Sequence, residues 1–321
     1  MKKVLFSIAI LLVLLLGSLL ILPYLFKDEI VAQVKTAANE NLNAKVDFKD
    51  VNVSFFRHFP RLSVGLEGLE VMGMEEFEGV KLVQCERLDV AVNLWSAIFG
   101  DAVEINGLYL QRPILKVYVL SNGKANYDIT KPDDSAKTTT TSESGGKIKL
   151  DHYAINDGSL YYDDRSLGME VEIDGLDHEG SGELYNDLYD LAMETHAGAL
   201  SVNYGGIQYL RNARTDWTTT LSADMKNMKF TLQNNNLKVN DLRLLLDGWV
   251  QMPENTEDIL MDLKFGTPEN TFKSLLSIVP GAYTKDFGDV QANGSVQFGG
   301  MAKGKYNEKS HPAFKLDFKV A

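Results

Sequence analysis

The side chains that most often carry out chemistry are present in this chain but not in a catalytic arrangement. The five histidines are scattered, as His58, His152, His178, His196 and His311. None belongs to a His-Glu-x-x-His motif, and the sequence has no Gly-x-Ser-x-Gly turn or phosphate-binding glycine loop. We therefore expect no enzyme activity, no catalytic residue and no cofactor.

Two pairs of adjacent acids lie beside predicted turns, Asp133-Asp134 and Asp163-Asp164. Neighbouring residues of a strand point to opposite faces, so neither pair is a natural acid and base couple. Asp157 could join Asp163 and Asp164 around a calcium ion on a loop, but their spacing is not that of an EF-hand. We expect no metal site.

Cysteine content and net charge narrow the class of protein further. Cys85 is the only cysteine, so it cannot form a disulfide within the chain, and we expect it to be a small buried residue. The formal charge is −12, with 44 acids against 32 bases. This balance argues against a nucleic-acid partner, which requires a basic surface.

A short basic cluster surrounds Pro60. It consists of Arg57, His58 and Arg61, next to two phenylalanines. Such a cluster could contact anionic lipid head groups near a bilayer. Because it is so short, we favour the alternative that it forms a solvated turn.

The N-terminus contains the longest apolar segment. Residues 4–22 carry no charge and follow Lys2 and Lys3. A bilayer core requires about 20 apolar residues in a helix, whereas the apolar region of a cleaved signal peptide is shorter and ends in small residues. We expect an uncleaved single-pass anchor in the inner membrane, with a cytoplasmic N-terminus and a periplasmic bulk. The anchor positions on which this depends are Val4, Leu11, Leu15, Leu19 and Leu22.

Beyond the anchor, the hydrophobic periodicity changes from helical to alternating. Residues 27–42 have helical spacing, and the residues after them alternate apolar and polar. The alternation shifts phase near Lys49-Asp50, which suggests a bulge or a turn there. It shifts phase again after Glu67-Gly68. Asn106-Gly107 lies between alternating runs and predicts a hairpin turn. One apolar and one polar face per strand is typical of an antiparallel sheet covered on one side.

The sequence divides into four regions. Residues 1–26 form the anchor, 27–130 a helix and β region, and 131–147 a flexible loop rich in Thr, Ser and Gly. Residues 148–321 continue the β region, with one helical stretch at 268–279. Because the alternation runs to the last residue and leaves an open edge, we expect a longer chain. The predicted fold is mostly β: a transmembrane helix, then a long, curved, antiparallel sheet shaped like a groove or taco, with few short helices.

Several segments resemble the AsmA family of envelope proteins. They are the anchor, the helix after it, and residues 94–113, 122–128 and 274–287. The resemblance implies a protein anchored in the inner membrane, with a periplasmic β-sheet curled into a groove. It also implies a role in outer-membrane biogenesis, and larger relatives look like carriers of phospholipid between membranes. Expected partners are the inner membrane, phospholipid and outer-membrane assembly factors.

A sheet with one apolar face could hold acyl chains, since each buried methylene contributes about 0.8 kcal/mol. The candidate groove residues are Leu62, Val64, Leu66, Leu88, Val90, Val92 and Leu94. Two alternatives stay open. These residues could be ordinary core between the sheet and a helix, because alternation looks the same in both cases. The protein could also be a scaffold or regulator of outer-membrane protein assembly and membrane targeting, without lipid cargo.

Overall fold

The computed structural model describes residues 31–32, 35–36, 39–40, 42–99, 104–130, 147–184, 187–254, 256, 258–268, 270–278, 294–307 and 309–320. The predicted anchor and most of the predicted loop at 131–147 lie outside the described residues. Within the described part, no helix is both long enough and apolar enough to span a membrane.

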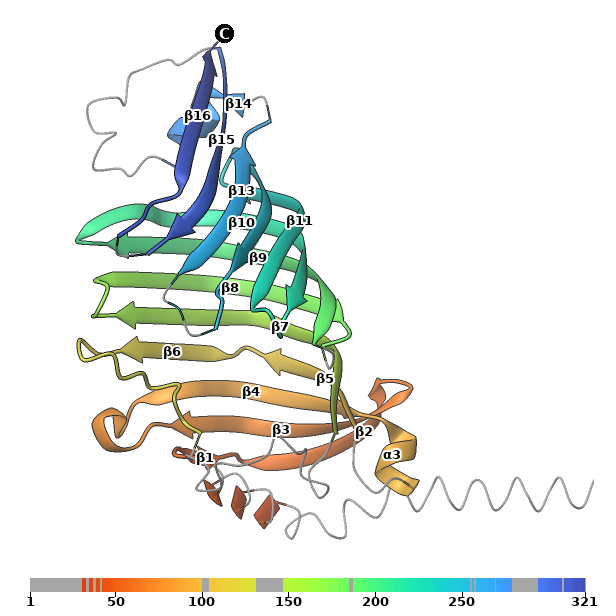
Figure 1. Ribbon diagram of the computed structural model, residues 1–321. Helices are drawn as coiled ribbons and strands as arrows, with labels where there is room; N and C mark the ends of the chain where they lie inside the picture. The colour runs from red at the N-terminus through yellow and green to blue at the C-terminus, as the bar shows by residue number, and fades with distance from the viewer. Residues whose placement is uncertain are drawn as a thin grey trace, which may run out of the picture.

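One 16-stranded sheet dominates the molecule (Figure 1). Its strands are β1 (Lys45–Asp47), β2 (Asp50–His58), β3 (Arg61–Met72), β4 (Lys81–Val92), β5 (Glu104–Gln111), β6 (Ile114–Val119), β7 (Lys147–Asp164), β8 (Met169–Gly182), β9 (Leu188–Tyr204), β10 (Ile207–Asp224), β11 (Lys229–Val239), β12 (Leu242–Gln251), β13 (Ile259–Gly266), β14 (Asn270–Thr271), β15 (Ser295–Tyr306) and β16 (Ala313–Val320). Among the described residues, the helices with defined bounds are short: η1 (Glu75–Phe77), α3 (Leu94–Phe99) and α4 (Phe272–Leu276). The mostly β prediction is therefore confirmed.

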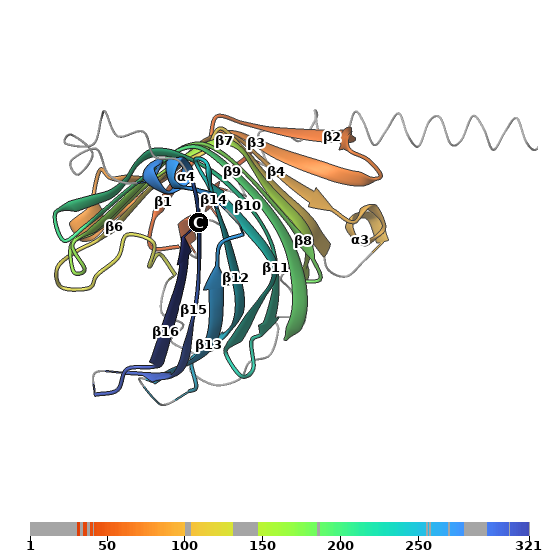
Figure 2. The ribbon, with the colours of Figure 1, turned by 90° about the horizontal axis from the view of Figure 1, so that it is seen from above.

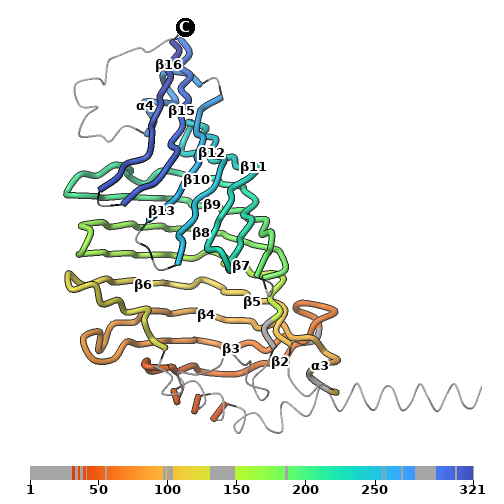
Figure 3. Tube along the Cα trace, viewed as in Figure 1, coloured from red at the N-terminus to blue at the C-terminus, as the bar shows by residue number. Residues whose placement is uncertain are grey.

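The sheet is mixed rather than wholly antiparallel, which corrects the prediction. β7 pairs in parallel with both β5 and β6, while the other strand pairs are antiparallel. The chain leaves β6 and returns at Lys147 beside the start of β5, so it must cross over instead of forming a hairpin. From β7 onward it runs through successive hairpins, which Figure 3 traces as far as β12.

The sheet is strongly curved. Seen from above, the strands follow an arch, and the last strands turn back toward its inner side (Figure 2). The curled shape expected from the sequence is therefore present, and one sheet connects the two β regions that the sequence analysis separated.

The principal core lies at the β1–β4 end. Its buried residues are Ala44, Val46, Phe48, Val51, Leu69, Val71, Leu82 and Cys85. The described residues between 31 and 40 are helical, and Val31 packs against this cluster. Asn39 accepts a hydrogen bond from the backbone N–H of Val46 and donates one to its carbonyl, both at 2.9 Å. This side chain thus satisfies backbone groups of β1 that an edge strand would leave unpaired.

Three local predictions are wrong. Asn106-Gly107 lies inside β5 instead of at a hairpin turn. A Cβ at Gly107 would lie 2.8 Å from the Tyr109 ring, so the glycine is required by a close approach rather than a turn. Leu94 begins α3 instead of extending β4, and the helix expected at 268–279 is reduced to α4, because Asn270 and Thr271 pair with β15.

Candidate functional site

The predicted groove residues on β3 and β4 share one face of the sheet. Residues directly opposite each other in an antiparallel pair project to the same side. The three such pairs are Leu62 with Val92, Val64 with Val90, and Leu66 with Leu88. Val92 is buried, and the other described members of these pairs are at least half-buried. Leu94, the seventh candidate, is not part of this array because it belongs to α3.

The same register carries this side, which we call the apolar face, across the whole sheet. On β5 it continues with Leu108 and Leu110, and on β7 with Tyr153 and Ile155. Farther along, the paired positions on this face include Leu176, Met193, Trp217, Leu221, Leu232, Leu237, Leu244, Leu246, Leu263, Phe265, Phe298, Leu316 and Phe318. Apolar side chains are thus present on one face from β2 to β16.

A row of residues with positive φ angles crosses the sheet where the alternation changes phase, and the strand register is irregular at three of them, Asp157, Gly175 and Asn212. Gly68, Arg112, Asp157, Gly175 and Asn212 have positive φ angles of 62°, 45°, 51°, 60° and 47°, respectively, and we call them the bulge line. A bulge inserts one residue and so reverses the alternation. The phase shift seen in the sequence at Glu67-Gly68 coincides with the positive φ of Gly68, although β3 keeps its register with β4 there.

Strand β8 shows the effect of the bulge line most clearly. Ile173, before Gly175, lies on the apolar face and pairs with Leu200 of β9, and Leu176, after Gly175, lies on the same face. Without the bulge, these two residues would point to opposite sides, because they are three positions apart. The two ends of the strand therefore contribute to one surface.

The apolar face is covered unevenly. At the β1–β4 end, the core cluster and Val31 cover it. Farther along, Leu232, Leu246, Leu263 and Phe265 are half-buried, and Phe318 on β16 is 66% exposed. Among the described residues, no buried core cluster comparable to that at β1–β4 forms over β11–β16. On this part of the face Val239, Leu242 and Val296 are buried, and the exposed apolar side chains include those of β16.

A hydrogen-bonded row of side chains crosses the middle of the apolar face. His178 contacts Thr195 Oγ1 through Nδ1 at 2.8 Å and the Tyr153 hydroxyl through Nε2 at 3.1 Å. Burial lowers the pKa of His178, so the ring is neutral at pH 7. The row adds polarity to the face without adding charge. Sequence reasoning missed it because these residues are far apart in the chain.

The opposite side, which we call the polar face, contains a buried carboxylate. Asp89 is 1% exposed, and it accepts hydrogen bonds from Arg57 at 2.7 Å and from Arg87 at 2.9 Å. A Cβ at Gly65 would lie 2.7 Å from Asp89 Oδ1, so only glycine leaves room for the carboxylate. The two guanidinium groups compensate for the desolvation of this charge.

The turn around Pro60 is exposed, as expected, but the basic side chains beside it form ion pairs and ring contacts with this polar face. Arg57 binds Asp89, and Arg61 binds Asp151 at 2.8 Å. The His58 ring stacks on Tyr109 with centroids 3.8 Å apart. Burial lowers the pKa of His58, and this effect outweighs the opposite effect of the nearby Asp89 carboxylate. The ring is therefore neutral at pH 7.

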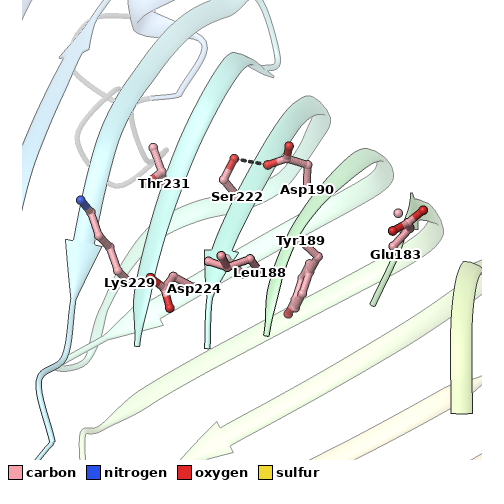
Figure 4. A pocket seen from close by; sticks show the side chains of 10 residues that line it. Glu183, Leu188, Tyr189, Asp190, Ser222, Asp224, Lys229 and Thr231 are labelled. Atoms are coloured by element: carbon pink, nitrogen blue, oxygen red, sulfur yellow. Dashed lines mark hydrogen bonds between the residues drawn. The ribbon is translucent and has the colours of Figure 1, made fainter. Parts of the chain in front are cut away.

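The polar face also contains a shallow depression of about 540 Å³ at the ends of β8–β11 (Figure 4). Asp190, Asp224 and Lys229 contribute charges to it, and Ser222 donates a hydrogen bond to Asp190. Its lining residues include no histidine or cysteine that could act as a base or nucleophile. Within the described ranges, no three His, Cys, Asp or Glu side chains are grouped as metal ligands.

The geometry thus shows a curled sheet with one apolar face, preceded in the sequence by an apolar N-terminal segment. A sequence model of the AsmA family matches residues 1–240. The chain belongs to the AsmA family. The matched part of this AsmA-family protein includes β1–β11, and β12–β16 continue the same sheet beyond it. No curated protein and no solved structure matches the chain.

Proposed function

We propose that this AsmA-family protein holds the acyl chains of phospholipids on its apolar face and carries them along the curled sheet. It does so as a protein anchored in the inner membrane, with the sheet in the periplasm, and it serves biogenesis of the cell envelope. The observation that carries the proposal is the continuity of the apolar face from β2 to β16 across the bulge line.

Two features support lipid as the ligand rather than a small polar substrate. The described part of the apolar face has no charged constellation, and its central row of polar side chains is neutral and hydrogen-bonded. Each methylene placed against the face contributes about 0.8 kcal/mol, so a chain of a dozen methylenes could bind without a polar contact.

Adjacent leucines on β12 allow a matched test. Leu246 pairs with Phe265 on the apolar face, and Leu245 pairs with Gly266 on the polar face. The protein is purified in mild detergent, and bound lipid is measured by mass spectrometry. We expect Leu246→Asp to lose copurified phospholipid and Leu245→Asp to retain it. Equal lipid content in both variants and in the wild type would contradict the proposal.

A second candidate function rests on β16. This strand pairs only with β15 among the described strands, and its residues Phe314, Phe318 and Val320 are 65%, 66% and 64% exposed. An exposed strand edge can accept a strand from another protein. We propose as the alternative a scaffold that contacts outer-membrane assembly factors and carries no lipid. Wild-type protein purified without lipid, together with loss of a partner on Phe318→Asp, would favour it.

A further inference from the structure

Four large aromatic side chains are exposed at one end of the sheet. Phe56 and Phe59, in the β2–β3 hairpin, are 81% and 71% exposed, and Trp95 and Phe99 of α3 are 70% and 74% exposed. The register places the two elements at the same end, because Leu62, next to the hairpin turn, pairs with the last residue of β4. Figures 1 and 2 both show them side by side. We call these four residues the aromatic end.

The aromatic end is held in place by polar contacts beneath it. Asn93 Oδ1 accepts hydrogen bonds from the backbone N–H groups of Trp95 and Ser96, and Ser96 Oγ accepts one from Glu104 N. Trp95 and Phe99 stack at 5.6 Å. On the hairpin, the flanking side chains are bound to the polar face through Asp89, Tyr109 and Asp151, as described above. The outward direction of the four rings is therefore built into the fold.

The helical residues before β1 run antiparallel to β1 and β2. Asn39 bonds to Val46, while Lys35 forms an ion pair with Asp47 and lies over the Phe48 ring. Toward the N-terminus, the helical residues therefore lie beside successively later residues of the segment that contains β1 and leads into β2. At Val31, the direction toward the N-terminus is therefore the direction along β2 toward the hairpin turn.

The length of chain between the apolar N-terminal segment and Val31 allows a bilayer to lie at the aromatic end of the sheet. Nine peptide units join Leu22 to Val31, which span about 14 Å as a helix and about 30 Å when extended. Val31 packs against the cluster that contains Val51, and the seven residues from Val51 to His58 rise about 23 Å along β2. The outer end of the apolar segment can therefore lie level with the aromatic end.

We propose that the aromatic end inserts into the interfacial region of the bilayer that the N-terminal segment spans. This inference rests on the proposed anchoring in the membrane. Trp is favoured at the head-group level, and Phe is among the apolar residues that insert at the boundary between head groups and acyl chains. Helix α3 has no charged residue that would oppose insertion. The contact fixes the orientation of the sheet relative to the membrane by adding a second point of attachment.

Trp95 provides a direct test. The full-length protein is reconstituted into phosphatidylcholine and phosphatidylglycerol vesicles, with Trp217 and Trp249 replaced by Phe so that Trp95 is the only tryptophan. We expect its emission to be blue-shifted and to lose intensity when the lipids carry bromine high on the acyl chain. Should the double replacement not fold, the difference between the wild type and Trp95→Phe gives the same reading.

The matched control moves the reporter to the far edge. In a background with all three tryptophans replaced, Lys319→Trp, on the polar face of β16, should keep its intensity in brominated vesicles, and Phe59→Trp should lose it. Flotation with the vesicles distinguishes failure of the proposed anchoring from failure of the proposed insertion of the aromatic end. Protein that does not float with vesicles contradicts the anchoring itself. Protein that floats while Trp95 stays unquenched overturns this inference alone.

Discussion

The buried carboxylate on β4 makes a quantitative prediction about stability. Asp89 is 1% exposed, and it is hydrogen-bonded to Arg57 and Arg87, which are 31% and 28% exposed. Removing one partner of a buried ion pair costs about 3–5 kcal/mol. Because both arginines keep partial access to water, we expect Asp89→Ala to cost about 3 kcal/mol, at the lower end of that range. This corresponds to a fall of roughly 6–12 °C in the unfolding midpoint of a domain of this size class.

The same strand supplies the control for this measurement. Glu86 also forms an ion pair, with Arg112, but its side chain is 51% exposed and that of Arg112 is 60% exposed. An exposed pair of this kind contributes about 0–1 kcal/mol. The assay is thermal unfolding of the detergent-solubilised full-length protein, followed by circular dichroism at pH 7. A midpoint for Asp89→Ala no lower than that for Glu86→Ala would refute the reasoning about the buried charge.

Three further predictions concern pH, the bulge line and the cysteine. Burial lowers the pKa of His58 and His178, so the unfolded chain binds more protons just below the ordinary histidine value. Stability should therefore fall as the pH drops below about 6.5, and replacing both by Gln should flatten that part of the curve of unfolding midpoint against pH. Gly175→Val should lower the unfolding midpoint, because its φ of 60° disfavours a branched side chain. Gly299→Val should cost less, because φ is not positive there and the nearest atom to an added Cβ is 3.7 Å away; an equal loss in both variants would contradict the bulge argument. Cys85 is 4% exposed and burial raises its pKa, so thiol reagents should label it only on unfolding, and labelling of the native protein at the unfolded rate would contradict this.

Much of the fold can be predicted from the sequence, because alternate residues of a strand lie on the same face and the apolar set lies on the face that becomes buried. Leu62, Val64 and Leu66 alternate with polar residues, and they do lie on one face. The phase shift after Gly68 coincides with its positive φ of 62°, although the register of β3 with β4 is unbroken there. In contrast, the parallel pairing of β7 with β5 and β6 leaves no signal in the alternation, because it depends on where the chain returns after its crossover.

The polar contacts were harder to predict. Asp89 lies between Leu88 and Val90 and reads as a solvent-facing residue of an alternating strand, although it is buried by arginines from the hairpin and from its own strand. The one available signal was Gly65, since a glycine inside a strand often marks a close approach. The prediction of a hairpin turn at Asn106-Gly107 was wrong for the same reason, because a glycine can be required by close packing as well as by a turn.

The central claim, that acyl chains lie on one face of the sheet, is tested most directly by photocrosslinking along β12. A photoreactive amino acid is placed in turn at 244, 245, 246 and 247 of the full-length protein in cells, and lipid adducts are measured. The register predicts adducts at positions 244 and 246 and none at 245 and 247. Adducts at all four positions, or at none, would contradict the account.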